Sequence, residues 1–217
     1  MNEASPADWV FTGLSPDSGA VDMLLPSGFA AYARLLHPVI TDAGDQRRLI
    51  RWRDIAPDLV PFDRRVQFRE VAAHSGFRAA PFQGNPADED LDVLLGILAS
   101  GTATPRACWF CVWDGYGDGG YPRISGPQGR DYWLSSGPLE AARTLRYPPG
   151  LWWPDDRAWC VATDIDLDST YIGGGPELIA ALLAAPDLEV LPSGSRDQVW
   201  PTREDGEPGD GERRQGY

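Results

Sequence analysis

Three aspartates occupy alternate positions in the chain, at Asp164, Asp166 and Asp168. If a strand continues through them, alternation places all three carboxylates on one face of a sheet. Such a row is stable when it faces water, when arginines pair with it, or when a hard cation such as Mg²⁺ or Ca²⁺ bridges it. Two interpretations stay open: a solvated strand edge, or a metal or substrate site in which Asp155 and Glu177 add ligands.

A second candidate lies just upstream, in the segment WWPDDR at residues 152–157. Trp152 and Trp153 precede a proline and two acids that are typical of a type I turn, and Arg157 can pair with either acid. The two tryptophans either cap the core or line a pocket beside the aspartates. In the second interpretation Trp152, Trp153, Asp155 and Arg157 belong to a binding surface.

The loop over residues 115–130 is rich in glycine but contains no phosphate-binding motif. Long loops in compact domains often carry binding residues. Tyr116, Tyr121 and Arg123 are therefore candidate ligand contacts, and the alternative is a flexible hairpin tip with no binding role.

Several reaction classes are excluded or unsupported. All 19 basic residues are arginine, so no lysine exists for a Schiff base, a pyridoxal phosphate anchor or a P-loop. Cys108 and Cys111 form a C-x-x-C pattern within a strand-like run, where residues three apart face opposite sides; neither redox chemistry nor structural zinc is predicted. His37 and His74 belong to no nucleophile motif, and His37 is predicted to close a helix.

Composition and charge bound the function further. The chain of 217 residues is long enough for a domain with a sizeable core. Its net charge of −13 predicts no nucleic-acid binding and favours a basic protein partner. Residues 1–11 do not resemble a secretory signal, and no apolar run is long enough to span a bilayer. We therefore expect a cytoplasmic protein without membrane contact.

Strands and helices that must position these residues follow one another irregularly. The clearest helix spans residues 85–100, where acids open the first turn and Leu91, Leu94, Leu95 and Leu98 share one face. Further helices are predicted over residues 29–37, 138–146 and 176–185, and strands over residues 106–114, 131–135, 158–166, 169–172 and 188–191. Hairpin signals without regular strand–helix alternation predict an α+β fold, a mainly antiparallel sheet with helices packed on one face.

The predicted organisation is one domain with two peripheral segments. Residues 23–192 form the single α+β domain. Residues 1–22 are rich in Pro, Ser, Gly and Asp and are expected to form a loosely ordered arm, and residues 193–217 a disordered acidic tail.

The segments WWPDDRAWCVATDIDLDSTYIGG, CWFCVWDGYG and DYWLSSGPL carry a resemblance. Together they resemble an uncharacterised family of small proteins from GC-rich bacteria, over roughly residues 23–192. That resemblance implies no catalytic residues. The layout is also similar to the SMI1/KNR4-like (SUKH) immunity domains, α+β binding modules that neutralise toxins, although the long insert after Gly115 departs from their pattern.

The sequence thus predicts a non-enzymatic, immunity-like binding protein. Its acidic, tryptophan-rich face would engage a protein partner of basic character, and no cofactor is required. The alternative is a metal-assisted hydrolase or small-molecule enzyme centred on Asp164, Asp166 and Asp168, with Mg²⁺ or Ca²⁺ as its ion.

Overall fold

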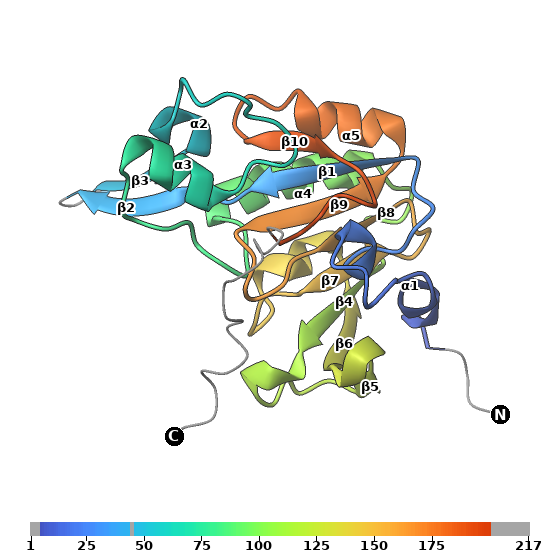
Figure 1. The fold of residues 1–217 in the computed structure, drawn as a ribbon. Coiled ribbons are helices and arrows are strands. Elements are labelled where there is room, and N and C mark those ends of the chain that lie inside the picture. Colours follow the sequence, from blue (N-terminus) through green and yellow to red (C-terminus); the bar gives the residue numbers. More distant parts are fainter. Residues whose placement is uncertain (1–4, 44–45, 201–217) are drawn as a thin grey trace.

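The computed structural model describes residues 5–43 and 46–200. They form a single α+β domain around an eight-stranded antiparallel sheet with the strand order β10-β1-β9-β8-β7-β4-β6-β5 (Figure 1). Its strands are β1 (Ala31–Leu36), β4 (Cys108–Trp113), β5 (Arg123–Ser125), β6 (Asp131–Gly137), β7 (Leu151–Pro154), β8 (Trp159–Ala162), β9 (Ser169–Gly174) and β10 (Val190–Ser193). A separate hairpin joins β2 (Val39–Ala43) to β3 (Gln46–Ile50). The predicted α+β class and the antiparallel sheet are confirmed.

Helices lie around the sheet on both sides. They are α1 (Asp8–Thr12), α2 (Trp52–Ile55), α3 (Phe68–Ser75), α4 (Asp88–Ser100) and α5 (Pro176–Leu183), with 3-10 turns η1 (Val21–Met23), η2 (Asp114–Tyr116), η3 (Pro127–Gly129) and η4 (Leu139–Arg143). Helices α4 and α5 cover one face, called here the helical face, and residues 7–25 with α1 cover the other, the N-terminal face (Figure 1). None of the helices in the described ranges is long and apolar enough to cross a membrane.

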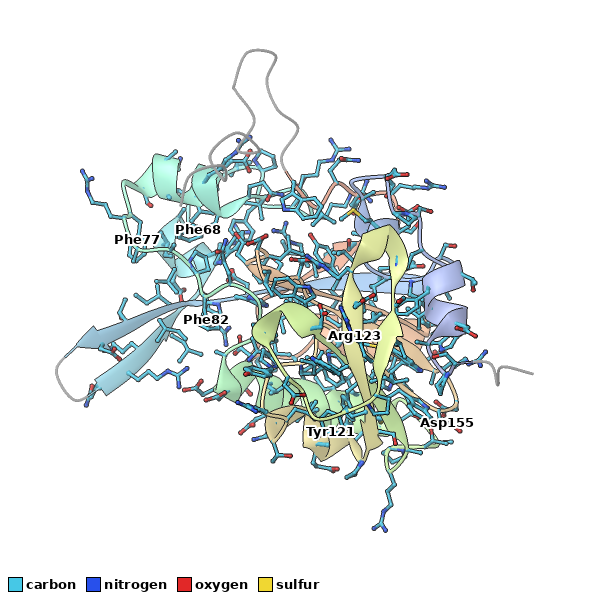
Figure 2. The ribbon with its side chains drawn as sticks, turned by 90° about the horizontal axis from the view of Figure 1, so that it is seen from below. Phe68, Phe77, Phe82, Tyr121, Arg123 and Asp155 are labelled. Carbon is cyan, nitrogen blue, oxygen red and sulfur yellow. The ribbon has the colours of Figure 1, made fainter. Side chains whose placement is uncertain are left out.

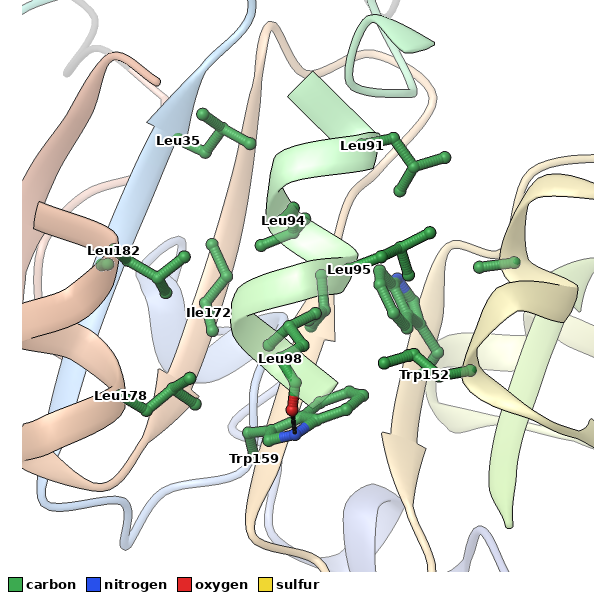
Figure 3. Packing of buried hydrophobic residues seen from close by; sticks show 14 of the residues in the cluster. Leu35, Leu91, Leu94, Leu95, Leu98, Trp152, Trp159, Ile172, Leu178 and Leu182 are labelled. Carbon is green, nitrogen blue, oxygen red and sulfur yellow. Dashed lines mark hydrogen bonds between the residues drawn. The ribbon is translucent and has the colours of Figure 1, made fainter. Parts of the chain in front are cut away.

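The larger core fills the helical face. Leucines of α4 and α5 pack there against indole rings from β7 and β8 (Figure 3). Trp152 and Trp159 meet edge to face with ring centroids 5.5 Å apart, and the Trp159 indole donates a hydrogen bond of 3.0 Å to the carbonyl oxygen of Leu98. The bond ties the last turn of α4 to the sheet, and the same carbonyl also accepts a hydrogen bond of 3.1 Å from the Gly101 amide that ends the helix.

Strand β8 lies in the centre of the sheet, and all four of its residues are buried. Trp159 and Val161 face the helical side, whereas Cys160 and Ala162 face the N-terminal side. A strand covered on both faces reads as an unbroken apolar run, which explains the segment's uniform hydrophobicity.

Residues 29–37 were predicted to form a helix, and this is wrong. Residues 31–36 form β1, which pairs with β9 on one side and β10 on the other. Ala33 and Leu35 enter the helical-face core, while Tyr32 faces the opposite core. The apolar residues of a doubly buried strand can also be read with a helical period, and here the pairing with both neighbours decides.

The predicted loose arm is also corrected. Residues 5–22 pack onto the N-terminal face, and Ala7, Val10 and Val21 are fully buried there. Residues 1–4 lie outside the described ranges. The Pro and Gly content signalled turns correctly, but the few apolar residues between those turns are enough to cover the sheet.

The described start of the predicted tail, residues 193–200, is likewise packed. Val199 is buried in the same core, and its amide donates a hydrogen bond of 3.1 Å to the carbonyl oxygen of Gly19. Nearby, the Val21 amide donates to the carbonyl oxygen of Asp197 at 2.9 Å. The remainder of the predicted tail, residues 201–217, lies outside the described ranges.

This packing predicts an unequal cost of leucine truncation. Leu94 is fully buried under the helical face, whereas Leu183 in α5 is 40% exposed. We expect Leu94→Ala to lower the free energy of unfolding by about 2–5 kcal/mol, because it removes buried methyl groups and leaves a cavity. Leu183→Ala should change it by no more than about 0.5 kcal/mol. Chemical denaturation measures both, and equal losses would contradict this account of the core.

Candidate functional site

The aspartate row does not form one face, which corrects the prediction of a shared carboxylate site. Strand β8 ends at Ala162, and the next residues turn, with the Leu167 amide donating to the carbonyl oxygen of Asp164 at 3.0 Å. Asp164 pairs with Arg130, while Asp166 is exposed. Within the described ranges, no group of three His, Cys, Asp or Glu residues is placed to hold a metal ion.

Asp168 lies apart from the other two aspartates and pairs with a buried arginine. Its carboxylate lies 3.6 Å from the guanidinium of Arg34, a fully buried side chain that also donates to the Ser169 hydroxyl at 3.0 Å and to the Val66 carbonyl at 2.7 Å. Burial raises the pKa of Asp168, and the charge of Arg34 opposes that rise. The carboxylate is therefore a counter-ion for a buried arginine.

The tryptophan pair belongs to the core. Trp152 points to the helical face and Trp153 to the N-terminal face, where its ring meets Trp9 at 5.9 Å, edge to face. Both side chains are buried, so neither is available to a ligand in this structure. Of the two interpretations of the WWP segment, the structure agrees with core capping.

The remaining predicted binding residues lie at two ends of β4. Asp155, which accepts a hydrogen bond of 3.1 Å from the Trp109 indole, and Arg157, which covers the Trp9 ring, lie beyond its first residue. Arg123 lies in β5, opposite Trp133 of β6, which in turn pairs with Val112 near the other end of β4, and Tyr121 comes shortly before it in the chain. Figure 2 shows Tyr121, Arg123 and Asp155. Strand β5 is three strands away from β7, which Asp155 follows, or about 14 Å across the sheet, so the predicted set does not form one surface.

Aromatic rings converge at the far end of β4, around the glycine-rich loop. We call this region the aromatic end; its rings are Trp113, Tyr116, Tyr121, Trp133 and Tyr147. Tyr116 stacks on Tyr147 with centroids 5.2 Å apart and meets Trp113 edge to face at 5.7 Å. The Trp133 indole donates to the Gly117 carbonyl at 2.7 Å. All five rings are partly or largely exposed, and Tyr121 is 41% exposed.

Two glycines allow the loop to lie directly on these rings. A Cβ atom on Gly119 would come within 2.5 Å of Trp133, and one on Gly115 would overlap the ring of Trp113. The glycine content of the loop therefore reflects close backbone approach to indole faces, and it does not form a phosphate cradle. The loop also contains a short strand, β5, which extends the sheet.

Ion pairs hold the charged groups of the aromatic end. Arg123 contacts Asp114 at 2.7 Å and Asp131 at 2.8 Å. Arg130 pairs with Asp164 and lies over the Trp113 ring, 5.3 Å from its centroid. Arg123 therefore joins the loop to β6, and Arg130 joins it to the turn after β8.

Beside Arg130, a cavity of about 80 Å³ separates the aromatic end from residues 14–24. Small-molecule sites usually measure about 300–1,000 Å³, so this cavity suits a single inserted side chain. Burial raises the pKa of Tyr132 in its wall to about 12. Burial, followed by the charge of Asp164, also raises the pKa of Tyr116.

The cysteines are free thiols in the core. Cys108 and Cys111 face opposite sides of β4, as predicted for residues three apart on a strand. Burial raises the pKa of Cys108 to about 12 and raises those of Cys111 and Cys160 as well. Nucleophilic thiolates are therefore disfavoured at neutral pH.

His37 lies in a buried hydrogen-bond chain and does not end a helix. Its Nδ1 donates to the Phe82 carbonyl at 2.9 Å, which leaves Nε2 to accept from the Thr170 hydroxyl at 2.8 Å. Thr170 in turn lies 2.6 Å from the Thr163 hydroxyl. Burial lowers the pKa of His37 to about 4, so the ring is neutral at physiological pH.

Sequence reasoning missed Trp113, Trp133, Tyr147 and Arg130, which complete the aromatic end. Trp113 and Trp133 were taken as strand residues without a further role. A usable signal was the spacing of each tryptophan from a glycine of the loop, but one sequence does not reveal which glycine meets which ring.

Comparison with protein-family models, with curated proteins and with solved structures finds no match for this chain.

The buried histidine predicts a pH-dependent stability. The pKa of His37 is lower in the folded state than its ordinary value of 6.5, so the unfolded chain takes up a proton first as the pH falls. The stability that the neutral His37 ring contributes is fully present above pH 6.5. As the pH falls towards 4, up to about 3 kcal/mol of the free energy of unfolding is lost. We expect His37→Asn to flatten this part of the unfolding free energy measured against pH. His74→Asn, at the surface, should keep most of the dependence, and an unchanged slope in His37→Asn would refute the assignment.

The close approach at Gly119 gives a second prediction. Gly119→Ala should lower the free energy of unfolding by about 1–3 kcal/mol and change the near-ultraviolet circular dichroism of the tryptophans, because the methyl group displaces the Trp133 ring. Gly96→Ala, in α4 with nothing within 4 Å of the added atom, should stabilise the protein by about 0.5–1 kcal/mol. Equal effects of the two changes would contradict the packing described.

Proposed function

We propose that the protein is a non-enzymatic binding module that engages a basic partner protein at the aromatic end. The observation that carries this proposal is the group of five exposed or partly exposed rings around the glycine-rich loop. Tryptophan, tyrosine and arginine are the residues that most often dominate the energy of protein interfaces. Here ring stacking and ion pairs fix the rings in place, which lowers the entropy lost on binding.

The charge of the chain supports a basic partner. At −13 it attracts positively charged proteins over distance and speeds their association, while the aromatic rings provide the short-range contacts. At the aromatic end, two carboxylates, Asp114 and Asp131, share the single guanidinium of Arg123. An immunity-like role in the cytoplasm, in which the partner is a toxin, extends the same proposal.

The described reactive groups support binding over catalysis. The three thiols are buried and their pKa values are raised, and both ring nitrogens of His37 are engaged. A metal-assisted hydrolase would need Asp164, Asp166 and Asp168 to converge, and each has a different environment. No observation therefore favours the enzymatic alternative.

The test compares two rings of the aromatic end with one exposed ring elsewhere on the protein. Tagged full-length protein captures partners from a lysate of its source organism, and the dissociation constant of the retained protein is then measured for variants. We expect Tyr116→Ala and Tyr121→Ala each to weaken binding at least tenfold, and raised salt to slow association. Phe82→Ala removes a ring that is 56% exposed outside the aromatic end and should change affinity less than about twofold. Capture of no protein, or equal losses in all variants, would refute the proposal.

A further inference from the structure

A second candidate site, lined by arginines, lies across the sheet from the aromatic end. Residues 64–70, at the start of α3, and residues 196–200 enclose a groove of about 360 Å³. Four arginines line it: Arg64, Arg65, Arg69 and Arg196. We call it the arginine groove. It adjoins β10, at the opposite edge of the eight-stranded sheet from β5, so it is independent of the function proposed above.

The groove has more positive than negative groups. Arg64 lies 3.4 Å from Asp197, and Arg196 lies 3.0 Å from Asp22, whose side chain is only 1% exposed. Within the described part of the chain, no carboxylate lies within ion-pair distance of Arg65 or Arg69, and both are exposed. The groove therefore keeps two free guanidinium groups.

Two acids line the groove, Asp197 and Glu70, and both are already engaged, Asp197 with Arg64. Glu70 accepts a hydrogen bond of 2.9 Å from the Gln67 amide, within the capping box that opens α3. It therefore stabilises the helix and is not directed at Arg65 or Arg69. In a chain of net charge −13, this cluster gathers an excess of positive groups in one place, which favours anions there.

We propose that the arginine groove binds an acidic peptide segment of a partner protein, with carboxylates paired to Arg65 and Arg69. Guanidinium forks match carboxylates in a bidentate geometry, and Arg64 and Arg196 already hold carboxylates of this chain.

Three further features favour a peptide over a small inorganic anion. The Gln198 side chain that lines the groove carries a donor and an acceptor, as a peptide backbone requires. Trp200, which is 39% exposed, adds an apolar contact at the rim. The volume also far exceeds that of a single phosphate and admits several side chains.

The chain itself carries a competing acidic sequence. Glu204, Asp205, Glu207, Asp210 and Glu212 follow Trp200 closely along the chain. A tethered segment competes at high effective concentration. Binding is therefore measured on the full chain and on a full-length variant in which these five acids are changed to their amides.

The probe is a fluorescent hexaglutamate peptide, and its anisotropy is followed at low salt. We expect saturable binding by at least one of the two proteins. Arg65→Gln with Arg69→Gln should weaken it at least tenfold, and added salt should weaken it progressively. Arg106→Gln, an exposed arginine outside the groove, should leave the affinity unchanged within about twofold. Circular dichroism verifies that all variants fold.

Three results would overturn the proposal. They are absence of hexaglutamate binding by both proteins, an equal loss in Arg106→Gln, and complete displacement of the peptide by inorganic phosphate at an equal concentration of negative charge. The last result would identify a site for a bare anion.

Discussion

A wide sheet with apolar side chains on both faces has to be covered on both. That constraint determines the rest of this structure. Helices α4 and α5 cover one face, and residues 7–25 cover the other with help from Val199. Backbone hydrogen bonds between residues 19–22 and 195–199 then join two segments that are far apart in the sequence. Both candidate binding sites lie at the edges of this doubly covered sheet, where the coverage ends.

Much of the fold could be predicted from the sequence where local signals agree with burial. Helix α4 was predicted nearly to its ends because its acids, its leucine spacing and Gly101 all indicate the same element. Strand β4 was predicted as central, and it pairs on both sides. Strand β1 was missed, since a doubly buried strand lacks alternation. The packing of residues 5–22 was missed because it depends on a few apolar residues, whose effect is not visible in the overall composition of the segment.

The candidate site shows a similar division. Tyr116, Tyr121 and Arg123 were predicted from sequence as contacts of the glycine-rich loop, and they belong to the aromatic end. Trp152 does not join them, because residue type gives no indication of which tryptophans the sheet buries. The aspartate row was inferred from alternation, which fails where a strand ends, and the end of β8 is set by its neighbours. Pairing with distant strands thus sets where β8 ends and where these aspartates point, and residue spacing alone does not reveal it.

The junction between residues 19–22 and 195–199 has a consequence for biosynthesis. Until Val199 has been synthesised and has left the ribosome, the N-terminal face lacks part of its cover, and apolar side chains of the central strands stay exposed there. Closure across such a sequence separation is also slow, because chain entropy is lost before the contacts form. The cover of the N-terminal face is therefore completed only after residues 195–199 have been synthesised.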